Sequence, residues 1–119
     1  MVVLFQPHRY SRAPLFTEVL HDEFGAAFDA ADEVVFMDVY PAGEAPVPGV
    51  SGKTFLDVVL EHEGHPSTAY VPRRVDVAPH LADMLREGDL VITMGAGDVT
   101  AIGPQLLDEL RRRASAEGR

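Results

Sequence analysis

Short apolar runs alternate with amphipathic segments along this sequence, and the alternation is the strongest constraint on its fold. The first run, Val2–Phe5, contains no polar residue, which is typical of a strand buried on both faces of a parallel sheet. Pro7 ends this strand, because proline has no N–H to donate to a neighbour. Three further runs are predicted strands: Glu33–Asp38, Thr68–Val71 and Asp89–Met94.

The segments after these runs carry apolar residues at helical spacing. We predict helices at Leu15–Phe28, Thr54–Glu63, Val77–Arg86 and Val99–Arg113. A residue suited to capping stands near the start of each: Ser11, Ser51, Asp76 and Asp98. Residues expected to face the core include Leu15, Val19 and Leu107. The last predicted turn, Arg111–Arg113, places cations where they oppose the helix dipole, so we interpret it as a solvated helix end.

The strand–helix order predicts an α/β fold. We expect a three-layer αβα sandwich with a mostly parallel, Rossmann-like sheet and right-handed crossovers. At 119 residues the chain is expected to form a single domain over residues 1–119. Parallel strands end at a common edge, so the loops after Pro7, Asp38 and Met94 should meet there, where open α/β sheets bind ligands.

Net charge and composition argue against some classes of function. The net charge of −9 argues against nucleic acid, whose binding depends on neutralising phosphates with Lys and Arg. The chain has no cysteine, and we find no signal peptide and no apolar run of the ~20 residues that a membrane helix needs, so a soluble cytoplasmic protein without a membrane partner is expected.

The positive charge is unevenly distributed. Before Arg73 the only Lys and Arg residues are Arg9, Arg12 and Lys53, and two of these lie in the loop after the first strand. That loop also holds His8, which is able to donate, accept or carry charge. Guanidinium groups bind carboxylates and phosphates through two N–H groups at once. An anion site and an ordinary pair of surface arginines both fit, and the residues alone favour neither.

Two glycine motifs suggest nucleotide binding. Gly49–Thr54 ends in Gly-Lys-Thr, but Val47 stands where a phosphate loop needs its first glycine, so we interpret the segment as a helix start. Gly95–Thr100 begins like a dinucleotide fingerprint but has Thr100 in place of the third glycine. By itself it is a tight strand-to-helix turn.

Acidic and histidine residues give no specific metal signature. Asp38, Glu44 and Asp98 could be a metal or acid–base cluster only if they converge, and nothing in their spacing requires it. No Ser-His-Asp arrangement is identifiable, so a free-standing hydrolase such as a phosphatase has little support.

Three stretches resemble one family. Gln6–Arg12 (QPHRYSR), Asp38–Glu44 (DVYPAGE) and Gly95–Gly97 (GAG) are similar, in this order, to motifs of the third, C-terminal domain of the Mur ligases that join L-alanine to UDP-N-acetylmuramate. The resemblance extends over nearly all of the chain. It implies an ATP-dependent ligase of peptidoglycan precursor synthesis, which acts in the cytoplasm and serves the cell wall, cell shape and cell division.

The resemblance also implies a set of substrate-binding residues. These are His8, Arg9, Tyr10, Arg12, Asp38, Tyr40, Glu44, Gly95, Ala96 and Gly97. Arg9 and Arg12 would hold the alanine carboxylate or developing phosphate charge, and His8 would pack against or orient the amine. The glycines would let the backbone approach the amino acid or nucleotide closely.

The family pattern is incomplete here. In the family, domains for the UDP-sugar and for ATP with magnesium precede this one, and a further strand–helix unit with Asp-Asp-Tyr and His-Pro motifs precedes the equivalent of Val2. We therefore expect an incomplete domain that is inactive alone, binds no ATP or magnesium alone, and exposes a sheet edge through which it could self-associate. The alternative is a non-catalytic anion-binding or interaction module on the same fold.

Overall fold

The computed structural model describes residues 1–95 and 97–117. Four strands and four α-helices alternate along the chain. The strands are β1 (Val2–Gln6), β2 (Glu33–Phe36), β3 (Ser67–Tyr70) and β4 (Val91–Gly95). The α-helices are α1 (His21–Ala26), α2 (Gly52–Glu61), α3 (Arg74–Met84) and α4 (Val99–Ala116).

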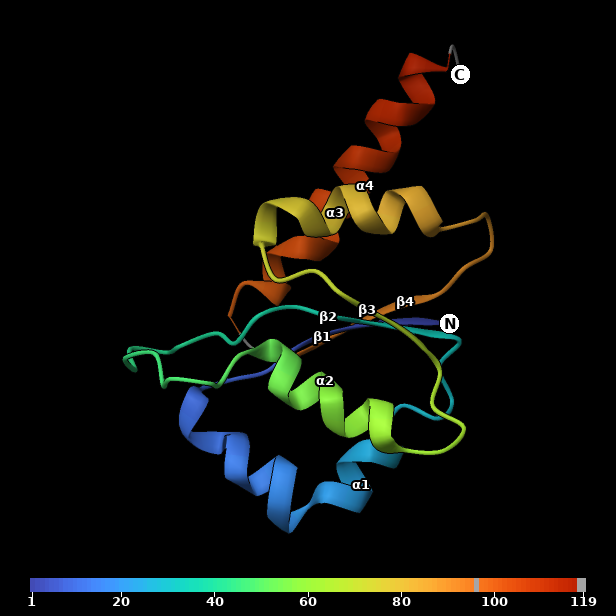
Figure 1. The fold of residues 1–119 in the computed structure, drawn as a ribbon. Helices are drawn as coiled ribbons and strands as arrows, with labels where there is room; N and C mark the ends of the chain where they lie inside the picture. The colour runs from blue at the N-terminus through green and yellow to red at the C-terminus, as the bar shows by residue number, and fades with distance from the viewer. Residues whose placement is uncertain (96, 118–119) are drawn as a thin grey trace.

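The strands form a single parallel sheet in the order β3-β2-β1-β4, which confirms the predicted α/β fold. In the register of the central pair, Val3 lies opposite Val34. Figure 1 views the sheet edge on, with α1 and α2 below it and α3 and α4 above it. The three layers are those of an αβα sandwich. The carboxyl ends of all four strands lie at the same edge, as the sequence predicts.

Side chains of the central strands pack alternately into two hydrophobic cores, one on each face of the sheet. On the α1–α2 face, Phe36 of β2 packs among other aromatic rings, with centroid distances of 5.2 Å to Phe5 and 5.6 Å to Phe28. On the α3–α4 face, Leu4 of β1 is fully buried with aliphatic residues such as Leu81. Burial on both faces explains the absence of polar residues from Val2 to Phe5.

The prediction that the first helix is one regular α-helix is wrong. Instead of one helix over Leu15–Phe28, the chain forms a 3₁₀ turn at Tyr10–Arg12, a π-helical turn at Leu15–Val19 and then α1. Leu15 and Val19, predicted to be buried, are 42% and 72% exposed. Leu107 of α4, also predicted to be buried, is 52% exposed.

The π-helical turn is accompanied by aromatic contacts with α2. It brings the rings of Phe16 and Phe24 to the same residue of α2, with centroids 5.9 and 6.3 Å from Phe55. An uninterrupted α-helix would advance by 100° per residue and would carry these two side chains, eight positions apart, 80° from one another. Ser11 does not cap this segment, because its side chain contacts Glu44.

The capping predictions had mixed outcomes. Ser51 is confirmed as the N-cap of α2, where its hydroxyl accepts from Lys53 N–H at 3.2 Å and its own N–H donates to Thr54 Oγ1 at 3.0 Å. For α3 the prediction is wrong: the helix begins at Arg74, and Asp76 lies in its first turn. Asp98 stands at the N-cap position of α4 but makes no capping hydrogen bond through its side chain.

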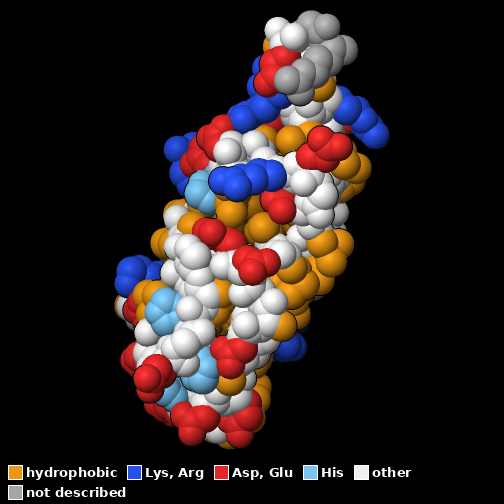
Figure 2. Space-filling model, turned by 90° about the vertical axis from the view of Figure 1, so that its right-hand side faces the viewer, with side chains coloured by type: hydrophobic (Ala, Val, Ile, Leu, Met, Phe, Trp, Pro, Cys, Tyr) orange, Lys and Arg blue, Asp and Glu red, His pale blue; other side chains and the backbone are white. Residues whose placement is uncertain are grey.

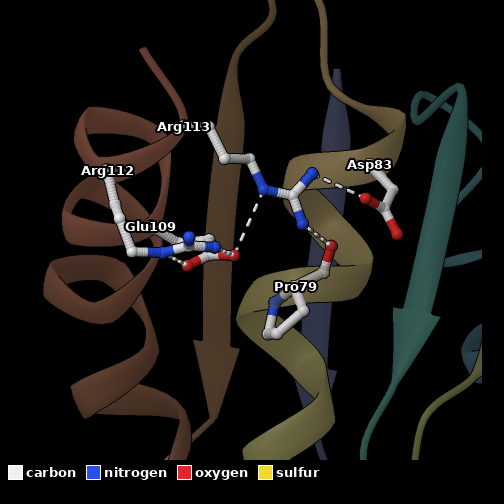
Figure 3. Close-up of polar contacts among 5 residues, drawn as sticks. All are labelled: Pro79, Asp83, Glu109, Arg112 and Arg113. Atoms are coloured by element: carbon white, nitrogen blue, oxygen red, sulfur yellow. Dashed lines mark hydrogen bonds and ion pairs between the residues drawn. The ribbon is translucent and has the colours of Figure 1, made fainter. Parts of the chain in front are cut away.

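The basic run near the end of α4 forms ion pairs. Figure 3 shows Arg113 reaching from α4 to α3, where it donates to Asp83 at 2.6 Å and to the Pro79 carbonyl at 3.5 Å. Arg112 donates to both oxygens of Glu109, and its hydrogen bond is the main reason that the pKa of Glu109 falls to about 2. The helix continues to Ala116, so of the three arginines only Arg113 lies in its last turn.

Within residues 1–95 and 97–117, none of the helices combines the length and the hydrophobicity needed to cross a bilayer.

Removing the Ser51 hydroxyl should destabilise the fold through α2. Ser51→Ala leaves the Lys53 N–H without its capping partner, and we expect the free energy of unfolding to fall by about 1 kcal/mol in urea titrations. Ser67→Ala, at an exposed position of β3, is the matched control and should change stability little. Equal losses in the two variants would contradict a capping role.

Candidate functional site

Backbone hydrogen bonds continue between the loops after β1 and β2, beyond the end of the sheet. Tyr40 N–H donates to the Pro7 carbonyl at 2.8 Å, and Arg9 N–H donates to the Tyr40 carbonyl at 2.8 Å. The rings of His8 and Tyr40 stack at a centroid distance of 5.8 Å and an angle of 20°. The cationic turn, which we define as His8–Arg12, is therefore fixed against the segment Asp38–Glu44.

A carboxylate holds the far end of the cationic turn. Glu44 accepts hydrogen bonds from the Ser11 N–H at 3.1 Å and from the Ser11 hydroxyl at 2.5 Å. These bonds favour the ionised form, and the pKa of Glu44 is lowered, first by the hydroxyl and then by the amide. Glu44, predicted to bind substrate, thus orders the loop that carries the arginines.

The arginines themselves face outward. Arg9 and Arg12 are both exposed. Arg9 has φ 70° and ψ 136°, a conformation that costs a non-glycine residue free energy and that persists only where surrounding contacts impose it. Tyr10 is half-buried and packs against the aromatic core.

Gln6 joins the first two motif segments to the start of α4, and the sequence reasoning missed this role. Its side chain is 3% exposed. Its Nε2 donates to the Asp38 carbonyl at 3.2 Å, and its Oε1 accepts from the Val99 N–H, at the start of α4, at 2.9 Å. Gln6 therefore does the capping that was predicted for Asp98. The available signal was an uncharged polar residue that ends an otherwise apolar, doubly buried strand.

Gly95 and Gly97, the two ends of the motif that we call the glycine bend, pack closely against Gln6 and Tyr40. A Cβ atom at Gly97, where φ is 98°, would lie 2.3 Å from the Tyr40 ring, and one at Gly95 would lie 2.5 Å from the Gln6 carbonyl oxygen. Glycine is thus required at both positions by internal contacts, independently of any ligand. Ala96, the remaining predicted site residue of the bend, lies outside the described residues.

Asp38 anchors α2. Its Oδ1 accepts from the N–H groups of Val39 and Gly52, both at 2.8 Å. It also acts on Tyr70 at the end of β3, whose pKa is raised chiefly by burial and further by the Asp38 charge.

The segment Gly49–Thr54 is a helix start, as predicted, and its polar groups are used internally. Lys53 Nζ pairs with Asp57 at 2.8 Å, and the Gly52 N–H is bonded to Asp38. In the described part of the chain, no three His, Asp or Glu side chains are placed to hold a metal ion. Because the Gly52 N–H and the Lys53 ammonium are engaged within the chain, Gly49–Thr54 does not fit a phosphate loop.

The convergence of the three segments at the carboxyl edge of the sheet matches the prediction. Two grooves lie elsewhere, one between β4, α3 and α4 and one between α1 and α2. Of the predicted site residues that the structure describes, none lines either of these two grooves. Tyr40 fills the space beside Gly97, and the Arg9 and Arg12 side chains are exposed.

Comparison with known proteins gives strong matches along nearly the whole chain. The UDP-N-acetylmuramate–L-alanine ligase of Mycobacterium sp. (strain JLS) is 51% identical over 114 residues, which are 96% of this chain and 22% of the relative. The enzymes of the same name from Syntrophotalea carbinolica and Brachyspira hyodysenteriae are 46% and 42% identical over 95% and 93% of this chain. The chain belongs to the Mur ligase family.

Only a part of a Mur ligase is represented. The chain spans between a fifth and a quarter of the length of these relatives, 22% to 24%, which is consistent with the C-terminal domain. No protein-family model matches it.

Replacing Gln6 should loosen this edge of the Mur ligase fold. Gln6→Met keeps the volume but leaves the buried Val99 N–H unpaired, so we expect a loss of about 1–3 kcal/mol in the free energy of unfolding. Gln105→Met, at a half-buried position of α4, is the matched control for urea titrations of both variants. A Gln6→Met loss no larger than the control's would show that the amide is dispensable.

The Ser11–Glu44 contact should be visible in a pH titration. Because the folded pKa of Glu44 lies below its ordinary 4.5, the contact stabilises the fold above pH 4.5, and this stabilisation is lost as the pH falls through the lowered pKa. In Ser11→Ala the pKa should rise toward 4.5 in NMR titrations of the side-chain carboxyl carbon. Ser67→Ala should leave the Glu44 titration unchanged, and an unchanged titration in Ser11→Ala would refute the assigned cause.

Proposed function

We propose that this chain supplies the amino-acid site of an ATP-dependent ligase that joins L-alanine to UDP-N-acetylmuramate in peptidoglycan precursor synthesis. The relatives carry this enzyme name. The observation that most supports the proposal is the cationic turn, which this chain holds in place at the carboxyl edge of the sheet through Tyr40 and Glu44.

The exposed polar groups suit a zwitterionic amino acid. Arg9 and Arg12 present planar guanidinium groups to solvent, and such groups hold a carboxylate through two parallel hydrogen bonds. In the proposed function they bind the alanine carboxylate or charge that develops on phosphate. His8, stacked on Tyr40, orients the attacking amine. Tyr10 packs inward and shapes the turn from behind.

The rest of the reaction belongs to residues outside this chain. ATP with magnesium would supply the activation of the muramoyl carboxylate, and no cluster of three His, Asp or Glu side chains that could hold the metal lies among the described residues. We therefore propose that the UDP-sugar and most of the ATP site lie in the remaining length of a Mur ligase, in the cytoplasm. This chain would complete the closed ATP site only through its glycine bend and arginines, and would be inactive alone.

A second candidate is a non-catalytic module that binds a small carboxylate or phosphate. The observation in its favour is that the cationic turn is ordered by contacts within this chain, so its arginines need no other domain to be presented. Such a module would bind its anion alone at micromolar level, about −8 kcal/mol.

A complementation assay tests the proposed function. The chain is titrated alone with L-alanine, ATP and UDP-N-acetylmuramate by calorimetry, and then combined with the amino-terminal remainder of the mycobacterial relative. We expect no tight binding to the chain alone, and phosphate release that requires all three substrates in the combined protein. Arg9→Ala and Arg12→Ala should each raise the KM for L-alanine at least tenfold, since a charge-assisted hydrogen bond contributes about 1.5–3 kcal/mol.

The assay has a control variant, and two different results would contradict the proposed function. Arg111→Ala removes an exposed guanidinium of α4 that pairs with Asp108, and should leave the KM unchanged. A combined protein that is folded but ligates nothing would count against the ligase assignment. Micromolar anion binding by the chain alone, abolished by Arg9→Ala, would favour the binding module.

A further inference from the structure

Tyr40 contacts both the cationic turn and the glycine bend. Its backbone pairs with the turn twice: its N–H donates to the Pro7 carbonyl and its carbonyl accepts from the Arg9 N–H, both at 2.8 Å. These bonds make a parallel bridge between His8 and Tyr40, beyond the ends of β1 and β2. The backbone of Tyr40 therefore fixes the place where the cationic turn leaves the sheet.

The ring of Tyr40 makes a second, separate set of contacts. A Cβ atom built on Gly97 would lie 2.3 Å from Cγ of the ring and 2.5 Å from each Cδ atom. Because these three distances are nearly equal, Gly97 lies against the face of the ring and not at its edge. The same ring stacks with the imidazole of His8 at an angle of 20°. One side chain thus connects the glycine bend to His8.

Both segments that Tyr40 joins contain strained backbone. Arg9 has φ 70° and Ala42 has φ 52°, and they are the non-glycine residues with positive φ in the described part of the chain. Such conformations persist only where neighbouring contacts impose them, and they are concentrated at functional sites. The Tyr40 carbonyl supplies one of these contacts, to the Arg9 N–H.

Stacking restrains His8 without using its polar atoms. A stack engages the face of an imidazole, whereas hydrogen bonds use the two nitrogens at its edge. A ring held by its face therefore has fewer orientations, while its nitrogens keep their ability to accept from or donate to a ligand. Holding a group in its productive orientation before the reaction lowers the entropic part of the barrier.

We propose that Tyr40 is a positioning residue of the amino-acid site, and that it acts through His8 without binding the substrate itself. Its ring holds the His8 imidazole at a fixed angle to the glycine bend, so that His8 stays aligned with the arginines of the same turn when it orients the attacking amine. This inference rests on the proposed ligase function. It gives Tyr40 a role different from the substrate contact that the family resemblance implies.

NMR of the chain alone measures the position of His8. An aromatic ring shifts the resonances of protons near its face, so Tyr40→Leu should move the His8 ring-proton resonances toward their values in the unfolded chain. Tyr40→Phe keeps the ring and should leave them unchanged. His21 and His62 are references in the same spectra, because they contact Glu61 and Asp29 near α1 and α2. In the lower half of Figure 2, which faces the amino ends of the strands, histidines lie among acidic side chains.

A second substitution tests whether the ring connects the two segments. Gly97→Ala would add a Cβ atom 2.3 Å from Tyr40 Cγ, so the ring must move. The His8 resonances should therefore shift in Gly97→Ala, but adding Gly97→Ala to Tyr40→Leu should shift them little further. Equal shifts in both backgrounds would show that His8 senses the glycine bend without the ring, and would overturn the proposal. Gly97→Ala measured alone keeps the proposal testable if Tyr40→Leu does not fold.

Kinetics of the combined protein separate positioning from binding. Tyr40→Leu should lower kcat by about tenfold or more, because a reacting group misplaced by about 1 Å can cost about 100-fold in rate. The KM for L-alanine should change little, since the arginines that hold the carboxylate are retained. Tyr40→Phe should keep the wild-type kcat. Tyr70→Leu removes another half-buried tyrosine at the carboxyl edge, and is the control for a loss of stability that leaves kcat and the His8 resonances unchanged.

Three results would overturn the proposal. The first is a set of His8 resonances that does not move in a Tyr40→Leu variant shown by circular dichroism to be folded. The second is a loss of kcat in Tyr40→Phe as large as in Tyr40→Leu, which would mean that the hydroxyl acts on the substrate. The third is a raised KM with unchanged kcat in Tyr40→Leu. A wild-type combined protein that ligates nothing would count against the proposed function, while the NMR results would still decide whether Tyr40 positions His8.

Discussion

The buried amide of Gln6 is the interaction on which the carboxyl edge of the sheet depends. It bonds to the Asp38 carbonyl on one side and to the first N–H of α4 on the other, and both partners lie in segments distant in sequence. Leaving the buried Val99 N–H without a partner would cost about 1–3 kcal/mol of folding free energy, so separation of these segments is unfavourable. This side chain fixes the Asp38 segment relative to α4, while Tyr40 joins the cationic turn to Gly97.

The sequence predicts the parallel sheet well because strands buried on both faces must be apolar throughout, as Val2–Phe5 is. It also predicts the cap of α2, since Ser51 acts on a residue two positions away. The prediction of one first helix was wrong because this segment contacts residues that are distant in the sequence. Its π-helical turn accompanies the packing of Phe16 and Phe24 against Phe55, and a contact between residues about 30–40 positions apart cannot be predicted from local spacing.

The candidate site shows a similar division. That the three motif segments meet could be predicted, because parallel strands end at one edge. Which of their atoms remain free could not be predicted. Asp38, Glu44 and Gly97 are the same residue types that a ligand site would use, yet their contacts are internal: with the start of α2, with Ser11 and with Tyr40. Only the hydrogen-bond partners distinguish a residue that builds a loop from one that faces a ligand.

This division limits what the chain contributes to specificity in the proposed ligase. With the acidic and glycine segments engaged internally, the outward polar groups are mainly Arg9, Arg12 and the partly exposed His8. Guanidinium groups recognise a carboxylate and not the side chain beside it. Selecting alanine over larger amino acids needs an enclosing wall against its methyl group. We propose that, in the ligase, Arg9 and Arg12 hold the charge of the amino acid and that other residues select its size.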